Sequence, residues 1–191
     1  DAEGKCKFTG LDPTGIGRLR FLVTPARIGT AFSPPNYEVG GTSKTDANFS
    51  ASPASSGTEV GSIAASFTAA NQSGGSFNLA DLFGGVILMD FAADGSEPCR
   101  ESAKQAEELY QKYKIRGFTY VLIVIQGSAA SWASTYGLTF PVLDDNAQAI
   151  YGAFRKSSIP LPHVLNRNMT IVYKEEGFRK TDIENLLSQI L

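Results

Sequence analysis

Two apolar stretches separated by a long amphipathic one constrain this chain more than any other feature. Residues 86–91 read Val-Ile-Leu-Met-Asp-Phe and residues 119–125 read Thr-Tyr-Val-Leu-Ile-Val-Ile. Both have the length and composition of buried strands. Between them, residues 98–114 carry apolar side chains at helical spacing, with Ser96 placed to cap the helix and Pro98 in its first turn. The pattern predicts a βα repeat around a largely buried sheet.

The remainder of the C-terminal part continues this alternation. Short helices are predicted over residues 130–136 and 145–154. A hairpin over residues 163–173 precedes a final amphipathic helix over residues 180–191. We therefore expect an α/β fold in which a central mixed sheet is flanked by helices, beginning near Val60.

The first 62 residues have a different composition. Glycine and proline break up residues 1–40, where only residues 19–23 suggest a strand, so this part is predicted to be an extended arm or a small β element. Residues 41–62 are rich in Ser, Gly, Thr and Ala, which is typical of a flexible linker. The predicted domain then spans residues 63–191, and the arm and linker form an N-terminal extension.

Charge and composition argue against several partners and cofactors. The chain has 17 Lys and Arg and 19 Asp and Glu, so its net charge of -2 gives no electrostatic reason to expect nucleic acid or an anionic membrane as partner. Its longest apolar run is far shorter than the ~20 residues that cross a bilayer. Two cysteines and one histidine indicate neither a disulfide-stapled scaffold nor a metal centre, and no cofactor is expected. The chain begins with Asp-Ala-Glu rather than Met, which is compatible with a trimmed, exported product.

The junction between the first strand and the long helix carries the most informative residues. Cys99 falls in the first helical turn, where free N–H groups and the helix dipole favour a thiolate, and Arg100 adds positive charge in the same direction. Asp90 interrupts the apolar strand. A carboxylate buried there has a raised pKa and can exchange a proton with a nearby thiol, whereas an Asp at a strand end is exposed or bonded to backbone. Both interpretations of Asp90 stay open, as does that of Cys99 as an inert buried cysteine.

With these residues, the last two-thirds of the chain resembles the thioredoxin-like superfamily, especially the exported TlpA/ResA-like thiol-disulfide oxidoreductases of the AhpC/TSA-redoxin type. Residues 77–91 are similar to the lead-in to the family's active-site loop, and residues 136–145 to its mid-domain stretch. Ile159 and Pro160 are similar to its cis-proline before a hairpin, with Pro162 as the rival for that position. The resemblance implies a thioredoxin-like fold.

The resemblance also implies roles and partners. Cys99 would be the reactive thiol and Asp90 its proton relay. The substrate groove would be lined by Glu97, Pro98, Ile159 and Pro160. The partners would be thiols or disulfides of other proteins, together with an upstream thiol reductant. The location would be the cell envelope, either periplasmic or membrane-anchored.

The chain departs from the family at one position. Where the family has Trp-Cys-x-x-Cys, this chain has Gly95-Ser96-Glu97-Pro98-Cys99. A serine hydroxyl lacks the acidity of a thiol and forms no disulfide, so Cys99 cannot complete a dithiol cycle within this motif. Three explanations stay open: a natural serine in a single-thiol enzyme or a redox-inactive binding domain, an engineered trap, or a second thiol supplied by Cys6.

The Ser-x-x-Cys spacing is also similar to the Thr/Ser-x-x-Cys of peroxiredoxins, although Ala92 stands where that motif has proline. We therefore expect first a thiol-disulfide oxidoreductase that acts through Cys99, with Ser96 and Asp90 completing the site. A redox-inactive binding module and a thiol peroxidase are the alternatives.

Overall fold

A computed structural model of the chain describes residues 19–21, 30–33, 37–39, 50–53, 56–154 and 158–191, with side chains from residue 56 onward. The chain forms two compact units, Asp1–Pro53 and Ala54–Leu191. Cys6 lies outside the described residues, so the explanation in which it supplies a second thiol stays open.

The N-terminal unit contains two antiparallel strand pairs. β1 (Leu19–Phe21) pairs with β3 (Tyr37–Val39), and β2 (Thr30–Ser33) pairs with β4 (Ser50–Pro53). The strand suggested for residues 19–23 corresponds to β1 over its first three residues, and the remainder of that stretch is outside the described part.

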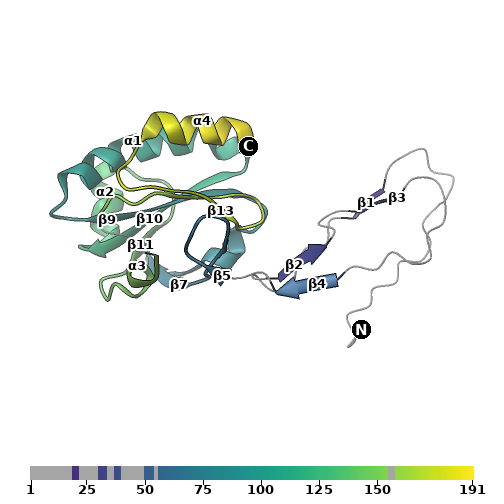
Figure 1. The fold of residues 1–191 in the computed structure, drawn as a ribbon. Coiled ribbons are helices and arrows are strands. Elements are labelled where there is room, and N and C mark those ends of the chain that lie inside the picture. Colours follow the sequence, from purple (N-terminus) through teal and green to yellow (C-terminus); the bar gives the residue numbers. More distant parts are fainter. Residues whose placement is uncertain (1–18, 22–29, 34–36, 40–49, 54–55, 155–157) are drawn as a thin grey trace. The chain divides into compact units, whose positions relative to one another are not determined.

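The C-terminal unit is built on a seven-stranded mixed sheet in the order β13-β12-β9-β10-β11-β7-β8 (Figure 1). Its strands are β7 (Thr68–Asn71), β8 (Ser76–Asn78), β9 (Val86–Ala93), β10 (Phe118–Gln126), β11 (Val142–Asp144), β12 (His163–Leu165) and β13 (Ile171–Lys174). The three central strands β9, β10 and β11 run parallel, and antiparallel strands flank them on both sides. The predicted strands at residues 86–91 and 119–125 are confirmed as β9 and β10.

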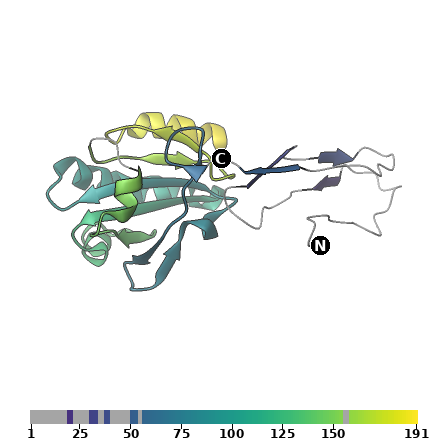
Figure 2. The same cartoon turned by 60° about the horizontal axis from the view of Figure 1, so that its bottom comes forward.

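Helices cover both faces of this sheet (Figure 2). Buried side chains of α1 (Glu97–Tyr113), α2 (Ala129–Tyr136) and α4 (Lys180–Ile190) join one apolar core cluster. On the opposite face, Phe154 of α3 (Ala149–Phe154) packs against Phe91 of β9. Because side chains alternate along a strand, Asp90 points to the face that α1 covers.

The predicted helix at residues 145–154 is shorter than expected, because its first residue caps the helix from outside. The Asp145 carboxylate accepts hydrogen bonds from the backbone N–H groups of Ala149, Ile150 and Tyr151 at 2.8–3.2 Å. These are donors that the first turn of a helix leaves unpaired. The helix therefore begins at Ala149. Two short 3-10 helices, η1 (Leu79–Leu82) and η2 (Lys114–Arg116), complete the unit.

A strap formed by residues 56–64 lies along the edge of the sheet. β5 (Ser56–Gly57) pairs with β6 (Ile63–Ala64), and the Gly61 N–H donates to the carbonyl of Ile171 in β13. The buried ammonium of Lys174 donates to the Thr58 carbonyl at 2.9 Å. The predicted linker thus overlaps a segment that is hydrogen-bonded to the sheet, while the division into arm, linker and domain stays a prediction. Among the described residues, no helix has both the length and the apolar character needed to cross a membrane.

Candidate functional site

The start of α1 brings Ser96 and Cys99 together. Ser96 is the N-cap of the helix, and its Oγ accepts a hydrogen bond from the Cys99 N–H at 3.4 Å. The Ser96 N–H donates to the Ala93 carbonyl at 3.0 Å, which closes the turn between β9 and α1. Glu97 and Pro98 fill the first helical turn and are exposed. The predicted cap is therefore confirmed, and the helix begins at Glu97, one residue before its predicted start.

Burial, rather than the helix start, governs the thiol. Cys99 is 0% exposed, is free of any disulfide, and its Sγ lies 3.8 Å from the Phe91 carbonyl oxygen. Burial raises the pKa of the Cys99 thiol above its ordinary value, and the nearby Asp90 charge raises it further. Ser96 and the Ala93 backbone lower that pKa, but they do not offset the burial. The prediction of a favoured thiolate at this helix start is therefore wrong.

Arg100 does little to stabilise a thiolate at Cys99, because its guanidinium has other partners. Its Nε donates to Glu97 Oε2 at 3.0 Å, and a second guanidinium nitrogen reaches the same carboxylate. Its Nη1 donates to the Asp94 carbonyl at 2.8 Å. Among the causes that move the pKa of the Cys99 thiol, the positive charge of Arg100 is the smallest. The positive charge of Arg100, which was predicted to favour the thiolate, thus lowers the pKa of the Cys99 thiol only slightly.

Asp90 is a fully buried carboxyl with three hydrogen-bond donors. Its Oδ1 accepts from the backbone N–H groups of Phe91 and Leu161, both at 2.8 Å, and its Oδ2 accepts from the Tyr120 hydroxyl at 3.2 Å. Burial raises the pKa of Asp90 to about 7, against the lowering effect of these three bonds. Because a carboxyl with this pKa is charged in some molecules and neutral in others at physiological pH, it is able to transfer a proton. Of the two interpretations left open for Asp90, the structure supports the buried carboxyl with a raised pKa over the exposed one.

The Ile159–Pro160 peptide bond is cis, as the resemblance implied, and Pro162 is not the cis residue. Ile159 is half-buried and packs against the core cluster that contains Cys99. Among the described residues, neither the N–H nor the C=O of Ile159 has a hydrogen-bond partner. The Pro160 loop, residues 158–162, is tied to Asp90 through Leu161.

Two contacts of this site were missed from the sequence. In the sequence, Tyr120 looks like one more residue of an apolar strand. No residue next to it in the sequence indicates that it is a hydrogen-bond partner of Asp90. Trp132 is only 3% exposed, and its Nε1–H donates to Asp94 Oδ1 at 2.6 Å. It thereby holds the loop that precedes Ser96. Both bonds join residues that are far apart in the sequence.

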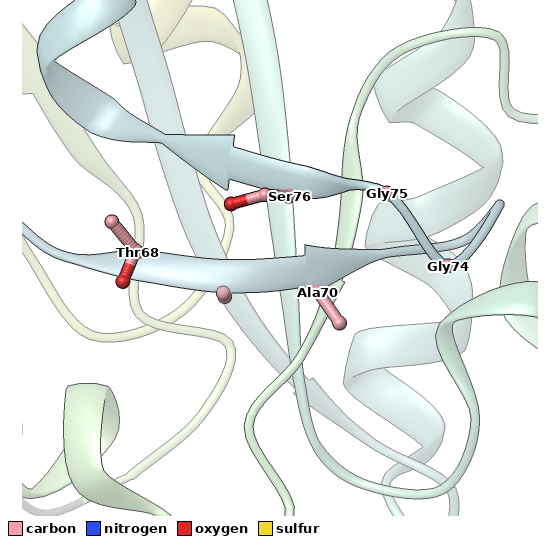
Figure 3. A pocket seen from close by; sticks show the side chains of 6 residues that line it. Thr68, Ala70, Gly74, Gly75 and Ser76 are labelled. Carbon is pink, nitrogen blue, oxygen red and sulfur yellow. The ribbon is translucent and has the colours of Figure 1, made fainter.

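Other parts of the described chain offer little for catalysis. Within residues 56–154 and 158–191, no three His, Cys, Asp or Glu side chains gather closely enough to hold a metal ion. A shallow pocket lies at the turn between β7 and β8, where small side chains and glycine backbone form its wall (Figure 3). It is lined by Thr68, Ala69, Ala70, Gly74, Gly75 and Ser76, none of which is ionisable.

Comparison with known proteins places this site in context. The AhpC/TSA family matches residues 60–177, more than half of the chain. The thiol-disulfide oxidoreductase ResA of Bacillus thuringiensis (strain Al Hakam) is 26% identical over 136 residues, which cover 69% of this chain and 79% of that protein.

Two solved structures extend the comparison. A putative thiol:disulfide interchange protein DsbE from Chlorobium tepidum has a TM-score of 0.62 at 27% identity, over 69% of this chain and 95% of that one. The thioredoxin domain of a thiol-disulfide oxidoreductase from Bacteroides vulgatus has a TM-score of 0.61 at 22% identity, over 69% and 96% of the two chains. The predicted thioredoxin-like fold is confirmed.

Proposed function

Because this chain belongs to the AhpC/TSA family, we propose that its C-terminal unit binds an extended, cysteine-bearing segment of a partner protein beside Pro160 without running a dithiol cycle of its own. The observation that carries the proposal is the complete burial of Cys99 behind Ser96. Thiol-disulfide exchange begins with attack by an accessible thiolate. Of Ser96 and Cys99, the more accessible side chain is the serine hydroxyl, and the thiol is buried with a raised pKa.

The Pro160 loop supplies the binding surface in this proposal. An extended peptide recognises a protein by pairing its backbone with unpaired N–H and C=O groups. Ile159 offers such a pair, and its half-buried side chain adds apolar contact area. Glu97 and Pro98, which lie between Ser96 and Cys99, are exposed and would contact the same segment. The similar proteins are thiol-disulfide oxidoreductases, which supports cysteine-bearing proteins as the partner class.

Location in the cell envelope is part of the same proposal. Disulfides form and persist in oxidising compartments such as the periplasm, so proteins that handle them are expected there. The exported location, periplasmic or membrane-anchored, follows from this partner class.

Binding to an unfolded chain with blocked cysteines tests the proposal directly. The probe is reduced, carbamidomethylated ribonuclease A, which has no thiol to exchange. We expect saturable binding that survives Cys99→Ala and is lost in Ile159→Asp, because the new charge would lie against the peptide backbone. Ile115→Asp is the matched control. Ile115 is 88% exposed and follows the far end of α1, about 25 Å from its first turn.

Three results would each argue against this proposal. One is a lack of binding by the unaltered chain, and another is equal binding by Ile159→Asp and Ile115→Asp. The third is that the unaltered chain binds only partners that carry free thiols or disulfides, and that this binding disappears in Cys99→Ala. This last result would support a covalent role for Cys99.

A single-thiol oxidoreductase is the second candidate, favoured by the pKa of about 7 at Asp90 beside the thiol. In that reaction Asp90 accepts the Cys99 proton, and the Cys99 thiolate attacks a partner disulfide. One partner sulfur joins Cys99 in a mixed disulfide and the other leaves as a thiolate. An external thiol reductant then releases the partner. The mixed disulfide, trapped by acid and detected by mass spectrometry, is the test, and Cys99→Ala is its control.

The peroxidase alternative has weaker support. A peroxidatic cysteine must be a thiolate, and burial raises the pKa of the Cys99 thiol. We expect peroxide consumption no faster than that of an ordinary free thiol, without accumulation of a sulfenic acid.

A further inference from the structure

Asp90 has a second set of contacts that thiol chemistry does not require. Its Oδ1 accepts the Leu161 N–H at 2.8 Å, so the carboxyl of β9 is bonded directly to the Pro160 loop. The Leu161 carbonyl accepts a hydrogen bond from His163 Nδ1 at 2.9 Å, and the Pro160 carbonyl accepts one from the Gly177 N–H, also at 2.9 Å. Of the side chains that hold the loop through Leu161, Asp90 is the one that carries a negative charge.

We propose that Asp90 is a positioning residue: its carboxylate, held by Tyr120, fixes the Pro160 loop through Leu161, and loss of the negative charge loosens the loop and weakens partner binding. This inference rests on the proposed function and names its regulation. A charged acceptor makes shorter and stronger hydrogen bonds than a neutral one. Protonation of Asp90 therefore weakens its bond to the Leu161 N–H without changing the apolar packing around it.

Of the titratable groups around Asp90, only Asp90 itself changes its charge near pH 7. Tyr120 faces it from β10 and Cys99 from α1, while the loop contributes backbone N–H alone. Burial raises the pKa of Tyr120 well above its ordinary value and also raises that of Cys99, so both stay neutral near pH 7. His163 lies on the opposite face of the sheet, against the rings of Phe91 and Phe154. The pKa of Asp90 is about 7, so this carboxyl gains or loses its negative charge near pH 7.

This role differs from proton relay in a testable way. A relay acts on Cys99 and has no effect once the thiol is removed. The loop clamp, by which we mean the bond from the Leu161 N–H to the Asp90 carboxylate, does not involve the thiol. It therefore persists in Cys99→Ala. Tyr120 sharpens the distinction, because its hydrogen bond lowers the pKa of Asp90. Removal of the hydroxyl in Tyr120→Phe should move the titration upward by about one pH unit.

The first experiment follows the Leu161 amide by NMR in the free protein between about pH 5.5 and pH 8.5. We expect a titration with a midpoint near the pKa of Asp90, about 7, in the unaltered chain and in Cys99→Ala. It should move upward in Tyr120→Phe and vanish in Asp90→Asn. A Leu161 amide that does not titrate, or a titration that vanishes in Cys99→Ala, would overturn the inference. If Asp90→Asn does not fold, the other three proteins decide the question.

The second experiment measures binding of carbamidomethylated ribonuclease A across the same pH range. We expect the affinity to be roughly fivefold weaker at the acidic end, in line with the loss of a charge-assisted hydrogen bond. Absence of binding at every pH, with Leu161 still titrating, would refute the proposed function and leave the clamp itself intact. Binding that is independent of pH while Leu161 titrates would overturn the link between clamp and affinity.

Discussion

The start of α1 and the Pro160 loop border the same buried carboxylate, but they differ in what they offer a partner. The helix start presents a serine, with its thiol 0% exposed behind it. The loop presents the backbone of Ile159, which has no hydrogen-bond partner within the described part of the chain, and Leu161 bonds the loop to Asp90. In the proposed function, the loop supplies the groups that recognise an extended chain, while the helix start lacks the accessible thiol that would exchange its disulfide. Recognition and exchange are separable properties of one fold.

The largest expected effect comes from restoring the missing thiol in Ser96→Cys. A cysteine at the N-cap is accessible, and the free N–H groups of the helix lower its thiol pKa. With Cys99 behind it, the pair can form and break a disulfide. We expect insulin reduction in the presence of dithiothreitol to rise from background to a clear catalytic rate.

A matched double variant, Ser96→Cys with Cys99→Ser, controls for the new thiol alone. It should form a mixed disulfide with insulin but turn over poorly, because no second thiol releases the product. Ser96→Cys could be as inactive as the original chain while its new thiol reacts freely with alkylating agents. This result would mean that the Pro160 loop does not bind substrates, and it would contradict the proposed difference between the loop and the helix start.

The next largest effect concerns stability and the charge of Asp90. Its pKa is about 7 in the folded chain against 3.8 for an ordinary Asp, so between these values the folded protein holds a proton that the unfolded chain has released. Stability from this group is thus present at low pH and lost as pH rises to about 7. At about 1.4 kcal/mol per pH unit, the loss is roughly 4 kcal/mol.

Asp90→Asn removes this loss because its amide does not ionise. We expect the difference in unfolding free energy between the two proteins, measured with urea, to change by roughly that amount between about pH 4 and pH 8. Other titrating groups cancel in this difference. Parallel pH profiles for the two proteins would contradict the raised pKa, and with it the charge change on which the loop clamp depends.

A smaller effect is expected at the loop that precedes Ser96. Trp132→Phe keeps an aromatic ring but removes the Nε1–H that donates to Asp94. We expect a loss of about 1–2 kcal/mol in unfolding free energy, since the bond involves a charged but exposed acceptor. Trp132→Leu is the comparison, because it removes the ring as well. Faster alkylation of Cys99 in Trp132→Phe would show that this bond also shields the thiol.

The sequence predicted the elements around the site better than the contacts within it. Apolar runs and helical spacing identified β9, α1 and β10, because a strand buried on both faces and an amphipathic helix leave strong periodic signals. The helix predicted to start at Asp145 begins at Ala149 instead. From sequence alone, a residue whose side chain caps a helix cannot be told apart from the first residue of that helix. The strap at residues 56–64 was missed because the sheet holds it through backbone hydrogen bonds and through the side chain of Lys174, which lies 116 residues after Thr58.

Within the site, the sequence singled out Asp90 and Cys99 but left two interpretations open for each. For Asp90 the structure supports the buried carboxyl with a raised pKa, and for Cys99 it supports the buried thiol over the favoured thiolate. For Cys99, the helix start is a local feature, whereas the burial that outweighs it comes from the packing of α1 on the sheet. Tyr120 and Leu161 reach Asp90 across separations of 30 and 71 residues, and no short pattern records such contacts.

The most direct test of the account is the rate at which iodoacetamide alkylates Cys99 in the native protein, read by mass spectrometry against the same chain in urea, with Cys6→Ser removing the other thiol. We expect native alkylation to be at least about tenfold slower than in the unfolded chain at mildly alkaline pH, because the thiol is buried and its pKa is raised. Native alkylation that is as fast as in urea, or faster, would contradict it. Cys99 would then be an accessible, activated thiol, and the single-thiol oxidoreductase would take the place of the binding module.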